Sequence, residues 1–387
     1  MLSSLFASME FPHCRRALEY AVNLAFPRRV GSAGEEQARR CLLHILERGS
    51  LSPWTEPVPL TGRGELLSRL IPWASVALFS LSWAVRGLWP QGALTIALLP
   101  VLFSLLRRRV WLEFGLRFPP QLQPGATGTS NILAEVRGGE PGAEHQVVWL
   151  LAHHDTKSYP LPMSVRMLAA MALPLIGLIV AAAALAGWGT SSYAWCVAAA
   201  VVAALLLSGG SGNASPGALD NAAALGVLLD LACHYRRNPP RTLVLRWVFT
   251  GAEEMGLLGA FALRHARGEE LRRGTHLFVN LDGVGSAGSL RVFGPREGWL
   301  TRAFLEASRK ERIPLCWSRL PPTMMMDHEV LASAGFPSVS LGCVARELRH
   351  LHSRRDHPGL IQVESLRETA RLLRHVIDAV DAGEGKI

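Results

Sequence analysis

The fold is decided by VVWLLAHHDTK, residues 147–157. Its apolar beginning has the length and composition of a buried strand, and its polar residues follow where that strand ends. A histidine at a strand's end, with an aspartate two residues on, is a common way to hold a metal. The imidazole ligates through one nitrogen, and a carboxylate can fix the other. His153 is therefore a candidate ligand, and Asp155 a candidate partner for it.

Predicted strands and helices alternate through the rest of the chain. Helices are predicted at 12–26 and from the capping pair Ser32 and Glu35 to Gly49. This alternation predicts an α/β fold, a three-layer α/β/α sandwich with a mixed, mostly parallel central sheet. Ligands of such sheets bind outside the carboxyl ends of the strands. Further strands are predicted at 58–60, 131–136, 146–153, 243–249, 276–281, 290–293 and 339–341, and further helices at 219–234, 257–266, 299–310 and 363–382.

Polar residues follow several of these strands. Asp220 opens a helix after a glycine-rich loop, and Glu253-Glu254 follows a strand. Asp282 ends another strand, and His352 lies in a polar loop. Zinc accepts both imidazole nitrogen and carboxylate oxygen. A set of two histidines and three carboxylates suits two zinc ions, with one carboxylate bridging and a further one left to move a proton.

The order of these motifs resembles the zinc aminopeptidases of the bacterial leucyl aminopeptidase and aminopeptidase Y type. Glutaminyl cyclases and glutamate carboxypeptidases are relatives of that family. The family pattern of His-x-Asp, Asp-Asn, Glu-Glu-x-Gly, Asp and His is met in full, and the resemblance covers residues 12–60 and 128–380. The matching positions are His153 and Asp155, Asp220 and Asn221, Glu253 to Gly256, Asp282, and His352.

The resemblance implies a role for each of these residues. Glu253 is expected to be the general base, Asp155 to orient His153, and Asp356 to order the loop around His352. Asp220 is expected to bridge the metals. The cofactor is expected to be two zinc ions per chain, and the substrate a peptide. The implied metal ligands are His153, Asp220, Glu254, Asp282 and His352.

Two alternative functions stay open. Asp155-Thr156-Lys157 is similar to a stretch in glutaminyl cyclases, which are single-zinc acyltransferases, whereas Glu253-Glu254-x-Gly256 favours a peptidase. A receptor or accessory protein of the same fold without activity is the third possibility. The metal count separates them: two for the peptidase, one for the cyclase and none for the inactive protein. The sequence does not define the preferred substrate residue or the oligomeric state.

Two apolar blocks interrupt the resemblance. Residues 66–111 and 165–208 each predict a helical hairpin, and 167–188 is uncharged over 22 residues, enough to span a bilayer. The peptidase-like domain is accordingly expected at 12–62, 120–160 and 209–387. Arginines cluster at the outer ends of both hairpins, so the positive-inside rule predicts a multi-pass membrane protein with its catalytic domain in the cytoplasm. Membrane lipid is thus an expected partner. The two helices of 66–111 are each shorter than the roughly 20 residues that span a bilayer, so a re-entrant or tilted hairpin and a pair of buried soluble helices stay open as alternatives.

The amino-acid composition narrows the remaining classes of function. The chain has 387 residues, is 49% hydrophobic and 18% charged, and carries a net charge of +9. Its arginine clusters lack the aromatic interleaving and motifs of nucleic-acid binding, so no nucleic-acid partner is expected. The six cysteines form no CxxC pair and are expected to be small buried apolar residues. Residues 1–11 lack a basic region and a long apolar core, so no cleavable signal peptide is predicted.

Overall fold

The computed structural model describes residues 12–60, 63–118, 128–139, 146–187, 189–321 and 324–384. The segment tested for a signal peptide, residues 1–11, lies outside them. The chain divides into two compact units. The sheet unit falls within Met1–Leu60, Gly115–Ser158 and Asn213–Ile387, and the helical unit within Thr61–Phe114 and Tyr159–Gly212.

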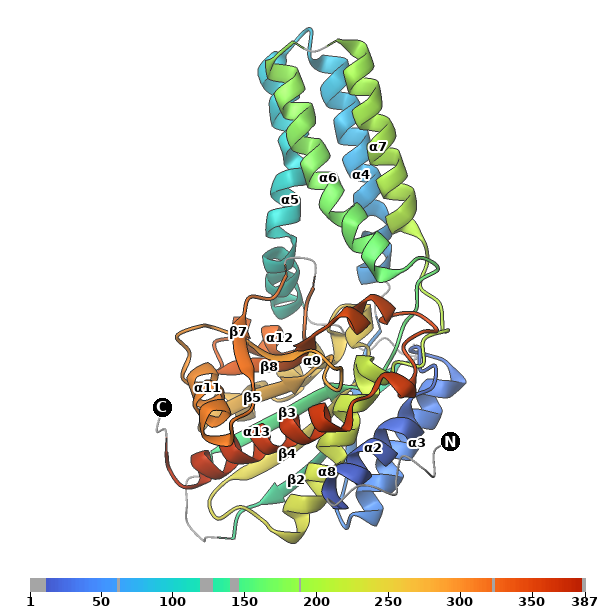
Figure 1. Cartoon of the computed structure of the whole chain (residues 1–387). Helices are drawn as coiled ribbons and strands as arrows, with labels where there is room; N and C mark the ends of the chain where they lie inside the picture. The colour runs from blue at the N-terminus through green and yellow to red at the C-terminus, as the bar shows by residue number, and fades with distance from the viewer. Residues whose placement is uncertain are drawn as a thin grey trace. The chain divides into compact units, whose positions relative to one another are not determined.

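The described strands of the sheet unit form one mixed sheet (Figure 1). Their order is β1-β2-β4-β3-β5-β8-β6-β7. The central strands β4, β3, β5 and β8 run parallel to one another, and β6 is parallel to β7. The pairs β1–β2, β2–β4 and β6–β8 are antiparallel. The strands are β1 Trp54–Val58, β2 Thr129–Arg137, β3 Val147–His153, β4 Val244–Thr250, β5 His276–Leu281, β6 Ser289–Phe293, β7 Leu315–Ser318 and β8 Ser338–Val344.

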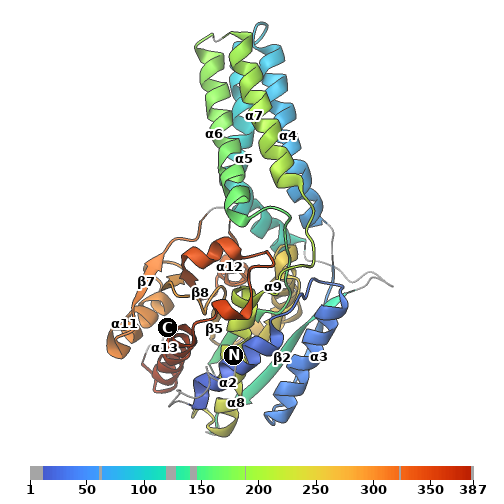
Figure 2. The same cartoon turned by 45° about the vertical axis from the view of Figure 1, so that its right-hand side comes forward.

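Helices cover both faces of this sheet (Figures 1 and 2). On one face α2, α8 and α13 pack together, and α8 also contacts β2, β3 and β4. On the other face α9 contacts β1 and β2, and α12 contacts β5 and β8. The predicted α/β/α sandwich with a mostly parallel sheet is therefore confirmed. The helices of the sheet unit are α2 Pro12–Leu24, α3 Ala33–Arg48, α8 Ala223–Arg237, α9 Leu258–Ala266, α10 Gly268–Leu271, α11 Trp299–Glu311, α12 His328–Ser333 and α13 Val363–Asp381.

The central strands are continuous apolar runs because both of their faces are covered. Every residue of β3, β4 and β5 is buried. Arg246 in β4 is the charged exception. Its guanidinium lies 2.5 Å from a carboxylate oxygen of Glu270 and 2.9 Å from one of Glu135, and 4.3 Å from the Trp149 ring centroid. A buried charge is thus paired within the sheet.

Some local predictions differ from the structure. The strand expected at 58–60 is β1, which ends at Val58. The capping pair of α3 forms only in part, because Ser32 Oγ accepts the Glu35 N–H at 3.2 Å but the Glu35 carboxylate accepts from Gly31. Cys233 and Cys343 are buried as expected, whereas Cys316 is exposed, so the expectation of burial is wrong there.

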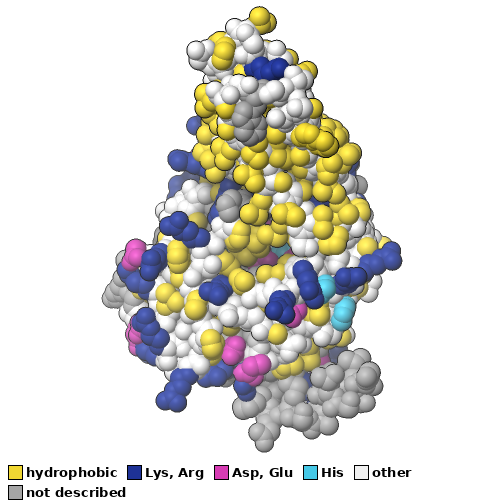
Figure 3. All heavy atoms as spheres, turned by 45° about the horizontal axis from the view of Figure 1, so that its top comes forward, with side chains coloured by type: hydrophobic (Ala, Val, Ile, Leu, Met, Phe, Trp, Pro, Cys, Tyr) yellow, Lys and Arg dark blue, Asp and Glu magenta, His cyan; other side chains and the backbone are white. Residues whose placement is uncertain are grey.

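The helical unit contains α4 Arg63–Val85, α5 Pro90–Arg117, α6 Met163–Leu185 and α7 Thr190–Ser208. Within the described residues, α6 and α7 are long and apolar enough to cross a membrane, and 69–85 is a shorter apolar stretch. The unit has a small core of its own, which includes Phe79, Ala97, Leu173 and Tyr193. Many of its large hydrophobic side chains face outward (Figure 3). Leu185 is 73% exposed and Trp195 is 77% exposed.

Candidate metal centre

Parallel pairing brings the ends of three strands to one edge of the sheet. His153 at the end of β3 lies opposite Thr250 at the end of β4. On the other side Leu151 pairs with Asn280 of β5, two residues before Asp282. Because Glu253 and Glu254 follow β4 in the short helix η2, Glu253–Met255, the sheet register alone places their backbone near His153.

The first predicted ligands form a compact group. Nε2 of His153 lies 3.0 Å from Oδ1 of Asp220 and 3.8 Å from Oδ1 of Asp282. All three side chains are largely removed from solvent. Donor atoms of these residues lie within 4.8 Å of one another, close enough to share one ion.

A second group shares Asp220 with the first. Nε2 of His352 lies 2.9 Å from Oδ2 of Asp220 and 2.9 Å from Oε1 of Glu254. The two oxygens of Asp220 therefore face two different histidines. The structure brings all five predicted ligands together, in the arrangement that a bridging carboxylate requires. Their ligation of metal stays a prediction.

Side chains outside these groups hold the peptide that carries Asp220. Asp220 lies in a turn, Ala218–Ala222, just before α8. The Asp356 carboxylate accepts the N–H groups of Leu219 at 2.8 Å and Asp220 at 3.2 Å. The Asn221 amide donates to the carbonyl of Leu281, at the end of β5. Asp356 thus acts on the Asp220 turn, in addition to lying near His352 in the chain.

Asp155 connects the first ligand with the two glutamates. Its carboxylate accepts the N–H groups of Glu253 and Glu254, each at 3.1 Å. Nδ1 of His153 lies 3.1 Å from the Asp155 main-chain oxygen and 3.7 Å from its nearer carboxylate oxygen. Asp155 thus lies next to His153, with its main-chain oxygen nearer than its carboxylate, and the carboxylate fixes the loop after β4. That Asp155 orients His153 stays a prediction.

Lys157 reaches the outer side of the second group. Its Nζ lies 2.7 Å from Oε2 of Glu254 and donates to the Glu254 carbonyl at 3.2 Å. Burial opposes ionisation of Glu254, but His352 and Lys157 lower its pKa to about 2. One oxygen of Glu254 therefore faces His352 and the other faces a lysine.

The charges of the site fit divalent cations. Four carboxylates, those of Asp220, Glu253, Glu254 and Asp282, share one buried region with two imidazoles. Burial opposes the charge of Asp220, yet the hydrogen bonds from His153 and His352 hold its pKa well below the ordinary value. Burial raises the pKa of Glu253 well above its ordinary value, and neighbouring carboxylates add to that rise. So dense a cluster of acids with nitrogen donors is the chemistry that zinc neutralises.

Two further acids approach this region. Asp327 precedes α12, and its carboxylate accepts from the Thr250 hydroxyl at 2.5 Å. Burial raises the pKa of Asp327 to about 7. Glu35 of α3 is buried and accepts a hydrogen bond from the Thr129 hydroxyl. Neither residue was among the predicted site residues, and Glu35 was expected only to cap the helix that begins after Ser32.

One buried cation was missed altogether. Arg28 follows α2 and is fully buried, with hydrogen bonds to the loops on both sides of the cluster. Its local sequence, Pro27-Arg28-Arg29, looks like an exposed basic turn. No local pattern in the sequence indicates the burial of Arg28.

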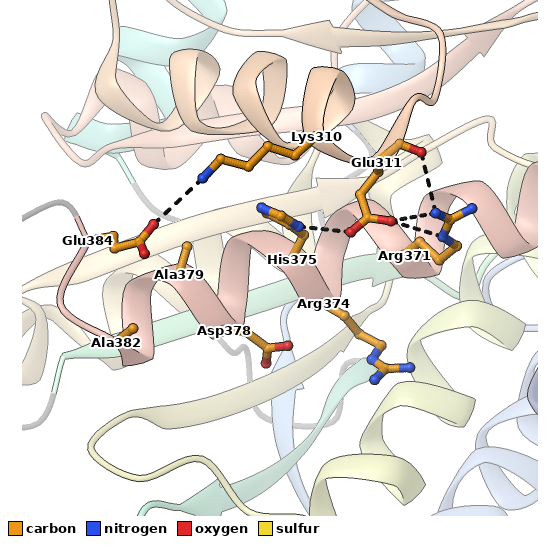
Figure 4. Close-up of a pocket in the computed structure, with 9 residues that line it drawn as sticks. All are labelled: Lys310, Glu311, Arg371, Arg374, His375, Asp378, Ala379, Ala382 and Glu384. Carbon is orange, nitrogen blue, oxygen red and sulfur yellow. Dashed lines mark hydrogen bonds and ion pairs between the residues drawn. The ribbon is translucent and has the colours of Figure 1, made fainter.

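A groove between α11 and α13 lies apart from these groups in the sheet unit (Figure 4). Most of its charges are paired: Glu311 contacts Arg371 at 2.5 Å and His375 at 2.9 Å, and Lys310 lies 3.8 Å from Glu384. Asp378 accepts from the Tyr235 hydroxyl. Because most of these polar groups have partners, few unpaired donors converge in this groove.

Solved structures with similar folds include aminopeptidases and a glutaminyl cyclase. An aminopeptidase from Aneurinibacillus sp. strain AM-1 is 15% identical, with a TM-score of 0.57 over 95% of this chain and 93% of that chain. A glutaminyl cyclase from an Acidobacteriales bacterium is 13% identical, with a TM-score of 0.57 over 98% of both chains. A zinc aminopeptidase from Bacillus subtilis is 21% identical, with a TM-score of 0.45 over 67% of this chain, which spans about half (51%) of that enzyme. At these identities the similarity to the first two structures, each with a TM-score of 0.57, establishes the fold alone.

Comparison by sequence gives the family. No curated protein matches the chain. A family model described as peptidase family M28 matches residues 131–377, which include all five predicted ligands and Glu253. The match covers more than half of the 387 residues and agrees with the resemblance drawn from the motifs. The chain belongs to peptidase family M28.

Proposed function

We propose that this protein is a two-zinc aminopeptidase. The observation that carries the proposal is the position of Asp220, whose Oδ1 lies 3.0 Å from Nε2 of His153 and whose Oδ2 lies 2.9 Å from Nε2 of His352. Asp282 would complete the first zinc site and Glu254 the second. When bound, zinc would lower the pKa of a water molecule and polarise the substrate carbonyl.

Glu253 is the proposed general base. It is buried beside both groups of donor atoms but belongs to neither. Its carboxylate is thus available to accept a proton from water and to pass it to the leaving amine. The Asp155 carboxylate, by accepting the Glu253 N–H at 3.1 Å, fixes the main chain from which this side chain extends.

Zinc content and substrate choice test the proposal together. Purified full-length protein in detergent is expected to bind two zinc ions per chain. It should hydrolyse peptides with a free N-terminal amine and leave N-acetylated versions of the same peptides intact. Equal turnover of free and blocked peptides would contradict aminopeptidase action. A chain that binds no zinc and turns over no substrate would instead support the inactive receptor or accessory protein.

A glutaminyl cyclase-like acyltransferase is the second candidate. The ammonium group of Lys157, 2.7 Å from Oε2 of Glu254, adds positive charge next to the second group of ligands. Such a charge disfavours a second cation and so favours a single-zinc enzyme. Peptides that begin with glutamine distinguish the two reactions, because a cyclase releases ammonia and keeps the peptide bond, whereas an aminopeptidase releases free glutamine.

We further propose that the helical unit anchors the protein in a membrane and that the sheet unit lies on the cytoplasmic side. The proposal is supported by α6 and α7, by the outward-facing hydrophobic side chains, and by arginines such as Arg69 and Arg166 near the outer ends of the hairpins. A reporter inserted at Gly189, directly before α7 begins at Thr190, should give a signal from outside the cytoplasm. A cytoplasmic signal from that position would contradict the topology.

A further inference from the structure

Arg28 is a fully buried cation whose guanidinium N–H groups donate hydrogen bonds to main-chain carbonyls. Its Nε donates to His154 at 2.9 Å, and its Nη2 donates to Gly217 at 3.2 Å. Its Nη1 contacts the carbonyls of Pro216 at 2.8 Å and Phe26 at 2.9 Å, and that of Leu24. Five carbonyls thus surround one guanidinium, which has five N–H donors in a planar fork.

These carbonyls belong to three separate segments. Leu24 and Phe26 end α2 and begin its following loop, and His154 directly follows the first ligand, His153. Pro216 and Gly217 precede the bridging residue Asp220 by only a few positions. The fork of Arg28 therefore directly connects the loop that follows one proposed zinc ligand, His153, with the loop that precedes the proposed bridging ligand, Asp220.

Main-chain contacts of the same region reinforce this connection. The Arg28 N–H donates to Oγ1 of Thr156 at 2.8 Å, and the Thr156 N–H donates to the Arg28 carbonyl at 3.1 Å. A Cβ atom on Gly217 would lie 2.3 Å from Cγ2 of Thr156 and 3.2 Å from Nη2 of Arg28. The loop before Asp220 is therefore packed directly against Arg28 and Thr156, without space between them.

These contacts lie next to the place where the chain leaves the sheet unit for the helical unit and later returns to it. The chain leaves the sheet unit after Ser158 and returns at Asn213. Ser158 Oγ accepts the Ala214 N–H at 2.9 Å, and the Arg29 N–H donates to Oδ1 of Asn213 at 2.9 Å. Arg28 lies beside this junction, so it joins two loops that are adjacent in space but separated in sequence by a long insertion.

We infer that Arg28 is a positioning residue for the metal centre: it holds the His153 and Asp220 loops at the separation at which both side chains face one ion. The inference rests on the proposed zinc site. A lysine would keep the charge but not the function, because its single nitrogen cannot reach His154 on one side and Gly217 on the other. Arginine is required because its guanidinium is wide enough to reach the carbonyls of both loops.

The test compares Arg28→Lys with a matched control, Arg246→Lys, in the full-length protein in detergent. Arg246 is also buried and hydrogen-bonded within the sheet unit, but its partners are Glu135 and Glu270. Both substitutions keep a positive charge and replace the forked guanidinium with a single ammonium group. Zinc affinity is measured by competition with a chromophoric chelator, and stability by thermal unfolding of the metal-free protein.

Arg28→Lys should weaken zinc binding about 10- to 100-fold, the usual effect of losing a residue that orients metal ligands. Arg246→Lys should lower the unfolding temperature of the metal-free protein and leave zinc affinity unchanged. If Arg28→Lys binds zinc as tightly as the control, the inference is overturned. A wild-type protein that binds no zinc would overturn the proposed function instead.

Hydrogen exchange of the metal-free protein tests the positioning without zinc. The N–H groups of Leu219 and Asp220 are held by Asp356 in the turn that follows the Arg28 contacts. Arg28→Lys should speed their exchange relative to Arg246→Lys, and equal exchange in both variants would contradict the inference. If Arg28→Lys does not fold, Thr156→Val removes one contact to Arg28 and should produce the same two changes, smaller in size. Unchanged zinc affinity and exchange in that variant would equally contradict it.

Discussion

The two units depart from the usual distribution of polar and apolar residues in opposite directions. The sheet unit buries charges: Arg28, Asp155 and Asp356 are each 0% exposed. The helical unit exposes hydrophobic side chains, such as Leu185 and Trp195. In a water-soluble domain, both buried charges and large exposed apolar patches need an explanation. Each departure therefore indicates what the unit contacts besides water.

Several hydroxyl groups of the helical unit are satisfied by main-chain carbonyls of its own helices. The Ser82 hydroxyl donates to the Ala93 carbonyl at 2.7 Å, and Thr95 and Ser104 donate to carbonyls one turn earlier in α5. Lipid offers no hydrogen bonds, so a membrane-spanning unit must satisfy its polar groups internally. In the sheet unit, by contrast, acids and histidines gather around a common point, as expected where metal ions neutralise them.

The largest expected effect comes from the bridging residue. Asp220→Ala should abolish peptidase activity and weaken zinc binding by more than the about 10- to 100-fold typical of groups behind the ligands. The reason is that both histidines lose their shared carboxylate. Zinc content after gel filtration and turnover of an aminoacyl substrate measure the two effects. A variant that keeps two zinc ions would show that the buried acids have another explanation.

Substitution of Glu253, the proposed general base, should lower the catalytic rate without weakening zinc binding. Glu253→Ala is expected to retain zinc and lower kcat about 10²- to 10⁴-fold, since a general base contributes a rate factor of that size. Glu269→Ala is the control, because the Glu269 side chain in α10 is 78% exposed. Activity retained in Glu253→Ala would refute the assignment of the base.

Exposed apolar residues of the helical unit should tolerate charge poorly. Leu178 in α6 is 49% exposed, and placing a charge at the centre of a membrane-spanning helix costs about 2.5–3.5 kcal/mol. Leu178→Asp should therefore reduce the fraction of protein that floats with membranes in a density gradient. Val344→Asp is a matched control, because Val344 is also 49% exposed but lies in β8 of the sheet unit. Equal flotation of both variants would contradict a membrane-embedded α6.

Strong local patterns in the sequence predicted the fold, and the predicted fold placed the candidate ligands at one edge of the sheet. The apolar runs of β3, β4 and β5 identify the central strands, and parallel strands place the residues that follow them at one edge. His153 and Asp282 follow from that rule. Short elements were missed: β7 has four residues and α12 has six, too few to show a clear periodicity.

Arg28 illustrates what the sequence could not predict. Its burial depends on carbonyls 126 and 188 positions away in the chain, those of His154 and Pro216. No local pattern encodes such convergence, because it results from tertiary packing of three loops. Asp356 is a similar case: it was expected to order the loop around His352, but its carboxylate accepts the N–H groups of Leu219 and Asp220, more than 130 positions earlier in the chain.

The smallest expected effect concerns a buried charge that the metal centre does not use. Asp230 in α8 is 6% exposed, and its Oδ1 is buried without a hydrogen-bond partner among the described residues. Burial raises the pKa of this carboxyl from 3.8 to about 6, although Arg16, Arg237 and Arg374 oppose the rise. The folded state therefore binds the proton more tightly than the unfolded state does, and stability falls as pH rises from 3.8 to about 6.

Asp230→Asn removes this pH-dependent cost. At about pH 7.5 the variant should be more stable than the wild-type protein by up to about 3 kcal/mol, and at about pH 4 the two should unfold alike. Denaturant unfolding of the metal-free protein, followed by tryptophan fluorescence at both pH values, measures the difference. Glu269→Gln, at an exposed position, should change stability at neither pH. If Asp230→Asn gains nothing at the higher pH, the sheet unit tolerates buried charge without metal, and the contrast with the helical unit no longer points to a metal centre.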